Sequence, residues 1–202
     1  MSKVRLEAFS DAVIAIIMTI MVLELKVPDG TDLAALQPRA SVFAAYLLSF
    51  VNLGIYWTNH HHMLHVTRQV NGAVLWANLH LLFWLSLFPF TTAWIGENRV
   101  ASLPTASYGV VGLLAAIAYY LLQGRIVALE GPDSTLARAI GRDRKGKLSP
   151  LLYALAIVLA FVQPWLAIAL YVTVALIWLV PDPRVERLIG ETPHEPGAEP
   201  DA

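Results

Sequence analysis

The sequence predicts an all-α membrane protein with six transmembrane helices. Of the 202 residues, 57% are hydrophobic and 14% are charged, whereas a typical soluble domain has about 25% charged residues. The apolar residues form runs of spanning length, since a bilayer core about 30 Å thick needs about 20 helical residues. The net charge of -1 gives no sign of nucleic-acid binding, and the absence of cysteine excludes disulfides, thiolate metal sites and a cysteine nucleophile.

Six helices are expected in a single membrane domain, residues 1–189, at about 8–27, 42–64, 73–95, 107–128, 149–162 and 165–180. The first run could imitate a signal peptide, but no small-residue cleavage site follows it and further apolar runs come later. It is therefore expected to remain as a helix.

Two prolines and the composition of the tail complete the predicted helix boundaries. Pro89 is expected to kink the third helix without ending it, because neighbouring helices can satisfy the freed carbonyl. A single helix over 148–180 would be about 50 Å long, so Gln163-Pro164 is interpreted as a turn between two short helices. One tilted helix there, giving five spans in all, is the alternative. The tail 190–202 is rich in proline and glutamate and is expected to be disordered.

Positive charges predict the orientation, because Lys and Arg accumulate on the cytoplasmic side. With six spans and both termini inside, the cytoplasmic side of the bacterial inner membrane receives Lys3, Arg5, Arg68, Arg125, Arg138, Arg142, Arg144, Lys145, Lys147, Arg184 and Arg187. The outside receives Lys26, Arg39 and Arg99. The basic loop 138–147 is interpreted as a topology anchor beside anionic lipid.

The first helix carries an acid and an apolar stripe. Asp11 lies about one turn inside the apolar stretch, where an acid is costly and usually functional or paired. Ser10 and Asp11 either bind neighbouring helices or Asp11 contacts an ion, and both readings stay open. Spacings of four and three then place six apolar residues on one face, with Thr19 beside them: Phe9, Val13, Ile16, Ile20, Leu23 and Val27. Such a face fits lipid, helix packing or a pore.

Histidines dominate the end of the second segment, at positions 60, 61, 62 and 65. His61 and His65 have the i, i+4 spacing of zinc ligands, but no nearby carboxylate completes a site, so neither a metal nor another cofactor is expected. His60 and His61 are interpreted as interface groups or partners of a neighbouring helix. In the third segment the spacing 76, 80, 83 predicts that Trp76 and His80 face the first helix, and tryptophans of an aromatic belt are the alternative.

Together these residues resemble the lysosomal potassium channel family, transmembrane protein 175. Arg5, Phe9, Ser10 and Asp11 form its R-x-x-x-F-S-D pattern. The resemblance extends over about 1–95 through the segments Leu-Glu-Leu-Lys-Val-Pro (23–28), Leu-Trp-Ala-Asn-Leu (75–79) and Leu-Phe-Pro-Phe-Thr (87–91).

This resemblance implies a prokaryotic potassium-selective channel, made of four copies of one six-helix repeat, with potassium as the permeant ion. The first helices of the family line the pore, so Ile16, Ile20 and Leu23 would form its constriction, with Thr19 at the selectivity layer. The motif Arg5, Phe9, Ser10 and Asp11 would pack against histidine, tryptophan and asparagine, for which this chain offers His60, His61, Trp76, Asn78 and His80.

The residues themselves add one constraint on selectivity. A filter of backbone carbonyls needs a glycine-rich extended loop between helices, and the sequence has none, so side chains must select the ion. Proton permeation alongside potassium stays open. The alternatives are a proton-coupled secondary transporter using Asp11 and, less favoured, a metal-dependent membrane enzyme using the histidines; no catalytic residue is assigned.

Overall fold

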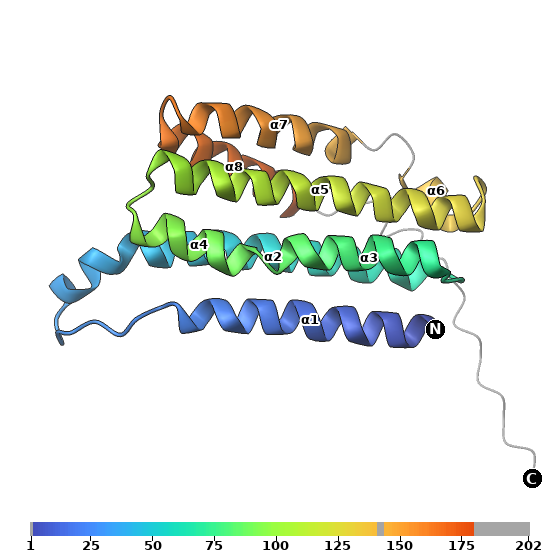
Figure 1. Cartoon of the computed structure of the whole chain (residues 1–202), viewed down its shortest axis with the longest axis horizontal. Helices are drawn as coiled ribbons and strands as arrows, with labels where there is room; N and C mark the ends of the chain where they lie inside the picture. The colour runs from blue at the N-terminus through green and yellow to red at the C-terminus, as the bar shows by residue number, and fades with distance from the viewer. Residues whose placement is uncertain (1, 141–143, 180–202) are drawn as a thin grey trace, which may run out of the picture.

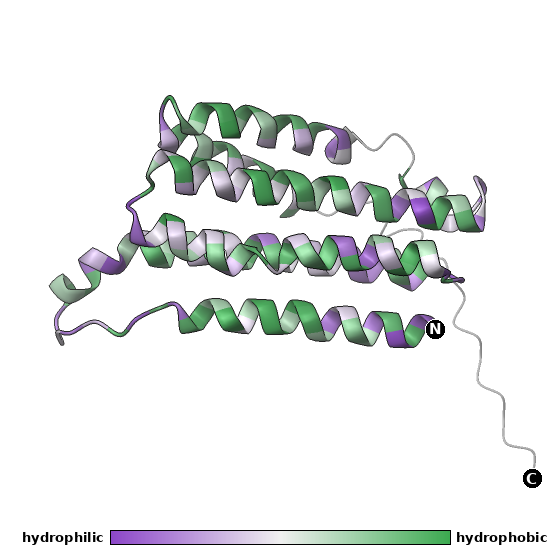
Figure 2. Cartoon of the chain, in the orientation of Figure 1, coloured by the Kyte–Doolittle hydropathy of each residue, from purple (hydrophilic) through white to green (hydrophobic). Residues whose placement is uncertain are grey.

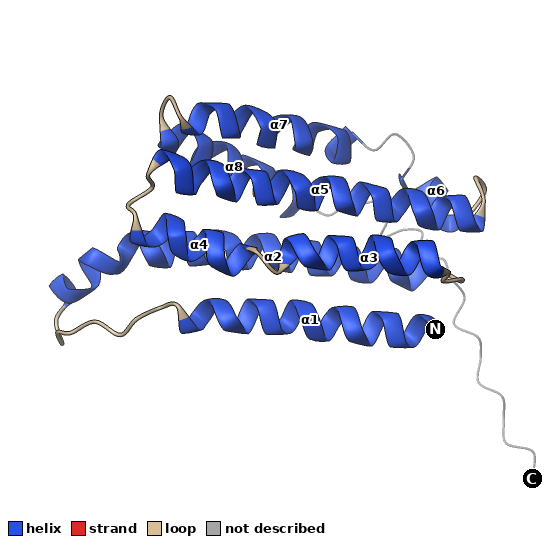
Figure 3. Ribbon diagram, viewed as in Figure 1, coloured by secondary structure: helices blue, strands red, loops and turns tan. Residues whose placement is uncertain are grey.

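The computed structural model describes residues 2–140 and 144–179, and in these ranges every regular element is a helix (Figure 3). The elements are α1 (Lys3–Leu23), η1 (Leu33–Arg39), α2 (Ala40–Val66), α3 (Gly72–Leu85), α4 (Phe88–Glu97), α5 (Ser102–Glu130), α6 (Thr135–Ile140), α7 (Arg144–Ala160) and α8 (Pro164–Leu179). The all-α prediction is confirmed. The tail 190–202 lies outside the described residues.

The long helices lie side by side and alternate in direction (Figure 1). Four stretches of the described residues are long and apolar enough to cross a membrane: Lys3–Leu23, Leu33–Val66, Gly72–Glu97 and Ser102–Glu130. A shorter apolar helix, α8, pairs with α7 across the turn at Gln163. The count of six spans remains a prediction.

The first helix differs from its predicted range at both ends. It begins at Lys3 rather than near residue 8, and it ends at Leu23 rather than at 27. The early end fits the sequence, because Val27 precedes Pro28 and a residue before proline is pushed towards extended backbone. Val27 therefore lies outside the helix, and the apolar stripe ends at Leu23.

The third predicted helix is two helices. α3 ends at Leu85, a two-residue turn follows, and Pro89 occupies the first turn of α4. Proline has no backbone N–H, and its ring would collide with the carbonyl four residues earlier, which belongs to Leu85. Within α4, the Thr92 hydroxyl donates to the Phe88 carbonyl at 2.6 Å.

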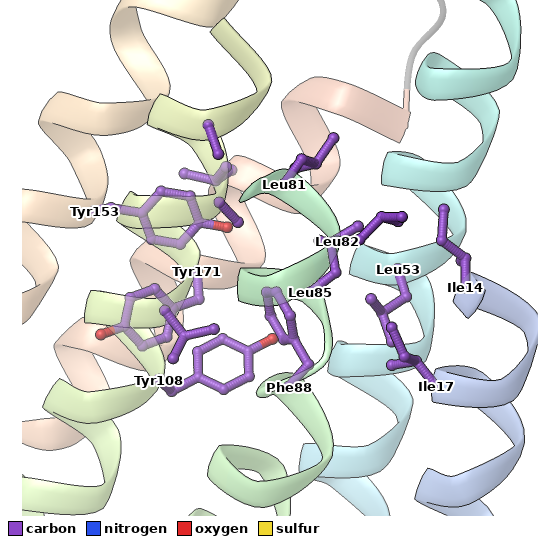
Figure 4. Packing of buried hydrophobic residues seen from close by; sticks show 14 of the residues in the cluster. Ile14, Ile17, Leu53, Leu81, Leu82, Leu85, Phe88, Tyr108, Tyr153 and Tyr171 are labelled. Carbon is purple, nitrogen blue, oxygen red and sulfur yellow. The ribbon is translucent and has the colours of Figure 1, made fainter. Parts of the chain in front are cut away.

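Small residues on α5 allow α7 and α8 to pack closely against it. A Cβ atom added at Gly112 would lie 2.5 Å from the Tyr153 ring of α7, and one added at Gly109 would overlap the Tyr171 hydroxyl of α8. Tyr108, Tyr153 and Tyr171 consequently lie together in the core (Figure 4). On the other side of the bundle, Ile14 and Ile17 of α1 approach α2 (Figure 4).

The alternation of the helices separates the charges. The predicted cytoplasmic residues that the structure describes lie at one end, where α1 begins, α2 meets α3 and α5 meets α6 (Figures 1 and 2). Lys26, Arg39 and Arg99 lie towards the opposite end. The arrangement agrees with a polarity in which the N-terminal end of α1 faces the cytoplasm.

Candidate functional site

The helix α1 has one buried face and one exposed face. Its buried residues follow spacings of four, four, three and four: Leu6, Ser10, Ile14, Ile17 and Met21. The opposite face turns away from the rest of the chain, and there Ile16 is 56% exposed and Leu23 77% exposed. Exposed apolar surface of this kind needs lipid or another protein surface to cover it.

Ser10 on the buried face starts a chain of hydrogen bonds that joins three helices. The Ser10 hydroxyl donates to the Leu6 carbonyl at 2.8 Å, and the Asn78 amide of α3 donates to Ser10 at 2.9 Å. The Asn78 carbonyl oxygen then lies 2.7 Å from Nε2 of His60 on α2. Ser10, Asn78 and His60 are buried. We call these three residues the polar chain.

The donor and acceptor roles along the polar chain follow from the Leu6 carbonyl at its end. A carbonyl can only accept, so the hydroxyl of Ser10 donates to Leu6 and accepts from the amide nitrogen of Asn78. The amide oxygen of Asn78 must therefore face His60, and Nε2 of His60 carries a proton. Among the described residues, Nδ1 of His60 is the one buried side-chain polar atom without a partner.

Asp11 lies beside the polar chain but has a different partner. The indole Nε1 of Trp57 on α2 donates to a carboxylate oxygen of Asp11 at 3.0 Å. An indole is a donor only, so the carboxyl oxygen of Asp11 is the acceptor of this bond. Sequence reasoning missed Trp57; its place three residues before His60 on the same helix was the available signal.

A further contact attaches the beginning of α1. The Lys3 ammonium donates to the His65 carbonyl at the end of α2 at 2.7 Å. Within residues 2–140 and 144–179, the side-chain hydrogen bonds between α1 and other helices thus involve only residues 3, 10 and 11 of α1.

The structure places several predicted partners away from α1. Trp76 is 75% exposed, and the Trp84 indole donates to His80 at 2.9 Å on the same helix. Within the single chain, Asn78 faces the first helix in place of residues 76 and 80, because each helix residue turns about 100° from the last. His61 is exposed and stacks on His65 instead of joining the polar chain.

The remaining motif residues also lie on the outer surface of the single chain. Arg5 is exposed and Phe9 is 47% exposed. Two residues of the R-x-x-x-F-S-D pattern meet side chains of other helices. Ser10 meets Asn78 and His60, and Asp11 meets Trp57. The structure does not bring Arg5 or Phe9 to them.

The predicted constriction residues share the exposed face of α1. Ile20 is 43% exposed, beside Ile16 and Leu23 on neighbouring turns. The Thr19 hydroxyl donates to the Ile16 carbonyl of its own helix at 2.9 Å. No group of three or more His, Cys, Asp or Glu residues among those described could hold a metal ion.

Comparisons with known proteins agree on one family. The family model described as endosomal/lysosomal potassium channel TMEM175 matches residues 5–89. A potassium channel of Chryseobacterium sp. (strain P1-3) is 52% identical over 191 residues, 95% of this chain and all of that one. The endosomal/lysosomal proton channel TMEM175 of Bos taurus is 31% identical over 179 residues, 80% of this chain but only 37% of the animal protein.

A solved structure is also similar. The crystal structure of a lysosomal potassium-selective channel TMEM175 homolog from Chamaesiphon minutus superposes with a TM-score of 0.73 and 27% sequence identity. The match covers 88% of this chain and 96% of that chain.

Proposed function

The chain belongs to the TMEM175 family of endosomal/lysosomal potassium channels, and from this membership we propose that it is a potassium-selective channel of a bacterial inner membrane. It is a multi-pass membrane protein with several apolar helices. Permeation of protons alongside potassium belongs to the same proposal, because an animal relative is named a proton channel.

The exposed face of α1 is the observation that carries the proposal. Buried contacts hold one side of this helix, while Ile16, Thr19, Ile20 and Leu23 turn away from the chain. A single α1 cannot surround a pore, so several copies must meet around an axis, and closed rings are the usual solution. We propose a homotetramer in which four α1 helices line the pore.

In that ring, Ile16, Ile20 and Leu23 form apolar layers, with Thr19 at the selectivity layer. A narrow apolar ring expels water, so an ion meets a large desolvation barrier until the ring widens. Selection by side chains follows from the absence of a glycine-rich filter loop in the sequence.

The two alternative functions receive less support. The relatives are named channels, which favours a channel over a proton-coupled transporter and over an enzyme. The polar chain of Ser10, Asn78 and His60 joins three helices through hydrogen bonds between its own members.

The test is ion flux through the purified full-length protein in liposomes. We expect potassium flux well above that of protein-free liposomes and above sodium flux under the same gradient. Flux equal to that of empty liposomes would refute the channel, whereas transport of potassium only with a proton gradient would support the transporter.

The position of the pore is tested by Ile16→Asn. If Ile16 forms a ring, an amide there wets the constriction, so the flux should rise and the preference for potassium over sodium should fall. Val158→Asn on α7 is the matched control, since Val158 is 63% exposed on a helix outside the proposed pore. Wild-type flux and selectivity in a well-assembled Ile16→Asn protein would remove Ile16 from the pore.

Orientation is tested by reporter fusions. A reporter after Arg144 should report the cytoplasm, and one after Gly30 should report the outside. A cytoplasmic signal at Gly30 would overturn the scheme.

A further inference from the structure

A groove lies on the outer surface of the bundle between α3 and α5, which pack side by side (Figure 1). Small residues of α3 make room for it, because Ala73 and Ala77 have no side-chain atoms beyond Cβ. The groove is open to the surroundings and has a volume of about 370 Å³, within the range of about 300–1,000 Å³ for small-molecule sites. One apolar and three polar side chains complete its lining: Leu121, Trp76, His80 and Arg125.

The polar groups of this groove are hydrogen-bond donors. The indole of Trp84 donates to Nε2 of His80 at 2.9 Å, so Nε2 is the acceptor and the proton of the neutral imidazole is on Nδ1. The indole of Trp76 and the guanidinium of Arg125 can only donate. Within residues 2–140 and 144–179, no group bonds to Arg125, to the indole of Trp76 or to Nδ1 of His80, and the described lining holds no acidic residue. The groove is therefore complementary to an anion that carries several acceptor oxygens.

The groove lies at the level where the apolar core of a membrane meets the headgroups. The 29 residues of α5 span about 43 Å, more than a bilayer core of about 30 Å, so both ends of α5 reach the headgroup layers. Arg125 lies about 7.5 Å along the helix axis from the end of α5. Trp76 lies about 6 Å from the beginning of α3, at the same end of the bundle. In the orientation proposed above, this end faces the cytoplasm.

The groove also faces away from the proposed pore helix. On α3, Asn78 turns towards α1 and donates to Ser10. Each helix residue turns about 100° from the last, so Trp76 and His80 each lie about 160° from Asn78, one on either side. In a ring with α1 at the axis, this side of α3 is turned outwards. Lipid is therefore the expected cover of the groove.

We propose that this groove is a binding site for an anionic phospholipid; the proposed function enters only through the orientation, which assigns the cytoplasmic leaflet. The phosphate lies at Arg125, because a guanidinium binds phosphate oxygens through paired hydrogen bonds. His80 lies one turn deeper than Trp76, where its Nδ1 meets the ester carbonyls, and the acyl chains continue past Leu121. A zwitterionic lipid fits less well, because the described lining has no acidic group for its ammonium. Basic pockets between transmembrane helices on the cytoplasmic side are a general means of binding anionic headgroups.

Binding is tested by native mass spectrometry of the full-length protein in detergent, with phosphatidylglycerol or phosphatidylcholine of the same acyl chains. We expect phosphatidylglycerol to bind more tightly. Arg125→Gln should weaken its binding by about threefold to tenfold, the effect of one basic residue at an anionic membrane surface. Arg68→Gln is the matched control, since Arg68 is exposed at the same end of the bundle but outside the groove; its effect should stay below about twofold. This readout needs no ion conduction, so it can fail or succeed separately from the channel proposal.

A filled groove supplies the second variant. Ala73→Leu places a larger side chain in the lining and should weaken the binding of phosphatidylglycerol. Ala154→Leu makes the same change at an exposed position of α7 and should leave binding intact. Inorganic phosphate at millimolar concentration should not displace the lipid, because it has no acyl chains to lie along the groove.

Five results would each overturn the proposal. Three are equal binding of the two lipids, an equal loss in Arg125→Gln and Arg68→Gln, and equal binding by Ala73→Leu and Ala154→Leu. The fourth is displacement by inorganic phosphate, which would indicate a site for the free anion. The fifth is a loss of the oligomer in the spectrum of Arg125→Gln, which would assign the groove to a contact between subunits.

Discussion

Asn78 is the residue on which the attachment of α1 depends most. It bonds on one side to Ser10 and on the other to His60. Hydrogen bonds between helices in membranes contribute about 0.6 kcal/mol on average and about 1.7 kcal/mol at most. Because Asn78→Ala breaks two such bonds, we expect it to lower the free energy of unfolding by about 1–3 kcal/mol.

The double variant separates the polar chain from general packing. Ser10→Ala alone breaks one hydrogen bond between helices, the bond from Asn78 to Ser10, and the bond from Ser10 to the Leu6 carbonyl within α1. The loss of the bond between helices should cost about 0.6–1.7 kcal/mol. In the Asn78→Ala background the same change should cost far less, since the partner is already gone. Denaturant unfolding of the purified protein, followed by tryptophan fluorescence, measures all three variants.

His80→Ala is the matched control, because this residue is polar, exposed and two positions further along the same helix. Its effect should stay within about 0.5 kcal/mol. If Asn78→Ala destabilised the protein no more than His80→Ala, or if Ser10→Ala and Asn78→Ala were additive, the polar chain would not be a coupled unit.

Three further predictions concern single contacts. Trp57→Phe should cost about 0.6–1.7 kcal/mol in unfolding by denaturant, because it removes the donor to Asp11; an unchanged midpoint would contradict this pairing. Gly112→Ala should cost about 1–3 kcal/mol through overpacking against α7, and a neutral effect in thermal unfolding would show that α7 can withdraw freely. Glu97→Gln should cost less than about 1 kcal/mol, and less again at high salt, because the pair with Lys26 is exposed; a salt-independent effect would contradict an ionic origin.

Run length was enough to predict the helical class, but not every helix boundary. Apolar runs of spanning length need no tertiary information, because the bilayer alone demands them. The break before Pro89 was harder, since a proline inside a membrane helix can either bend it or end it. The end of α1 at Leu23 was signalled by Pro28, whose effect on Val27 is local.

The site was only partly predictable. Periodicity groups Trp76 with His80 and separates both from Asn78, but it does not say which group faces another helix. That choice depends on a partner distant in sequence, and Ser10 lies 68 residues from Asn78. The position of Ile16 is equally hard to predict from the sequence, because an apolar side chain suits both a lipid-facing surface and an apolar constriction. Only the family membership favours the pore.

The two halves of α1 differ in their polar contacts with other helices. Its side-chain hydrogen bonds to other helices arise from residues 3, 10 and 11, whereas Ile16 to Leu23 lie in the second half of the helix. Beyond Leu23, the exposed pair of Lys26 and Glu97 makes the next such contact. Within the described chain, hydrogen bonds to other helices therefore hold α1 in its N-terminal half and not in its second half. The second half of α1 packs on its neighbours through apolar side chains, Ile17 and Met21 among them, so it can tilt without breaking any buried hydrogen bond to a neighbouring helix among the described residues. In the proposed ring of four α1 helices, such a tilt would change the radius at Ile16.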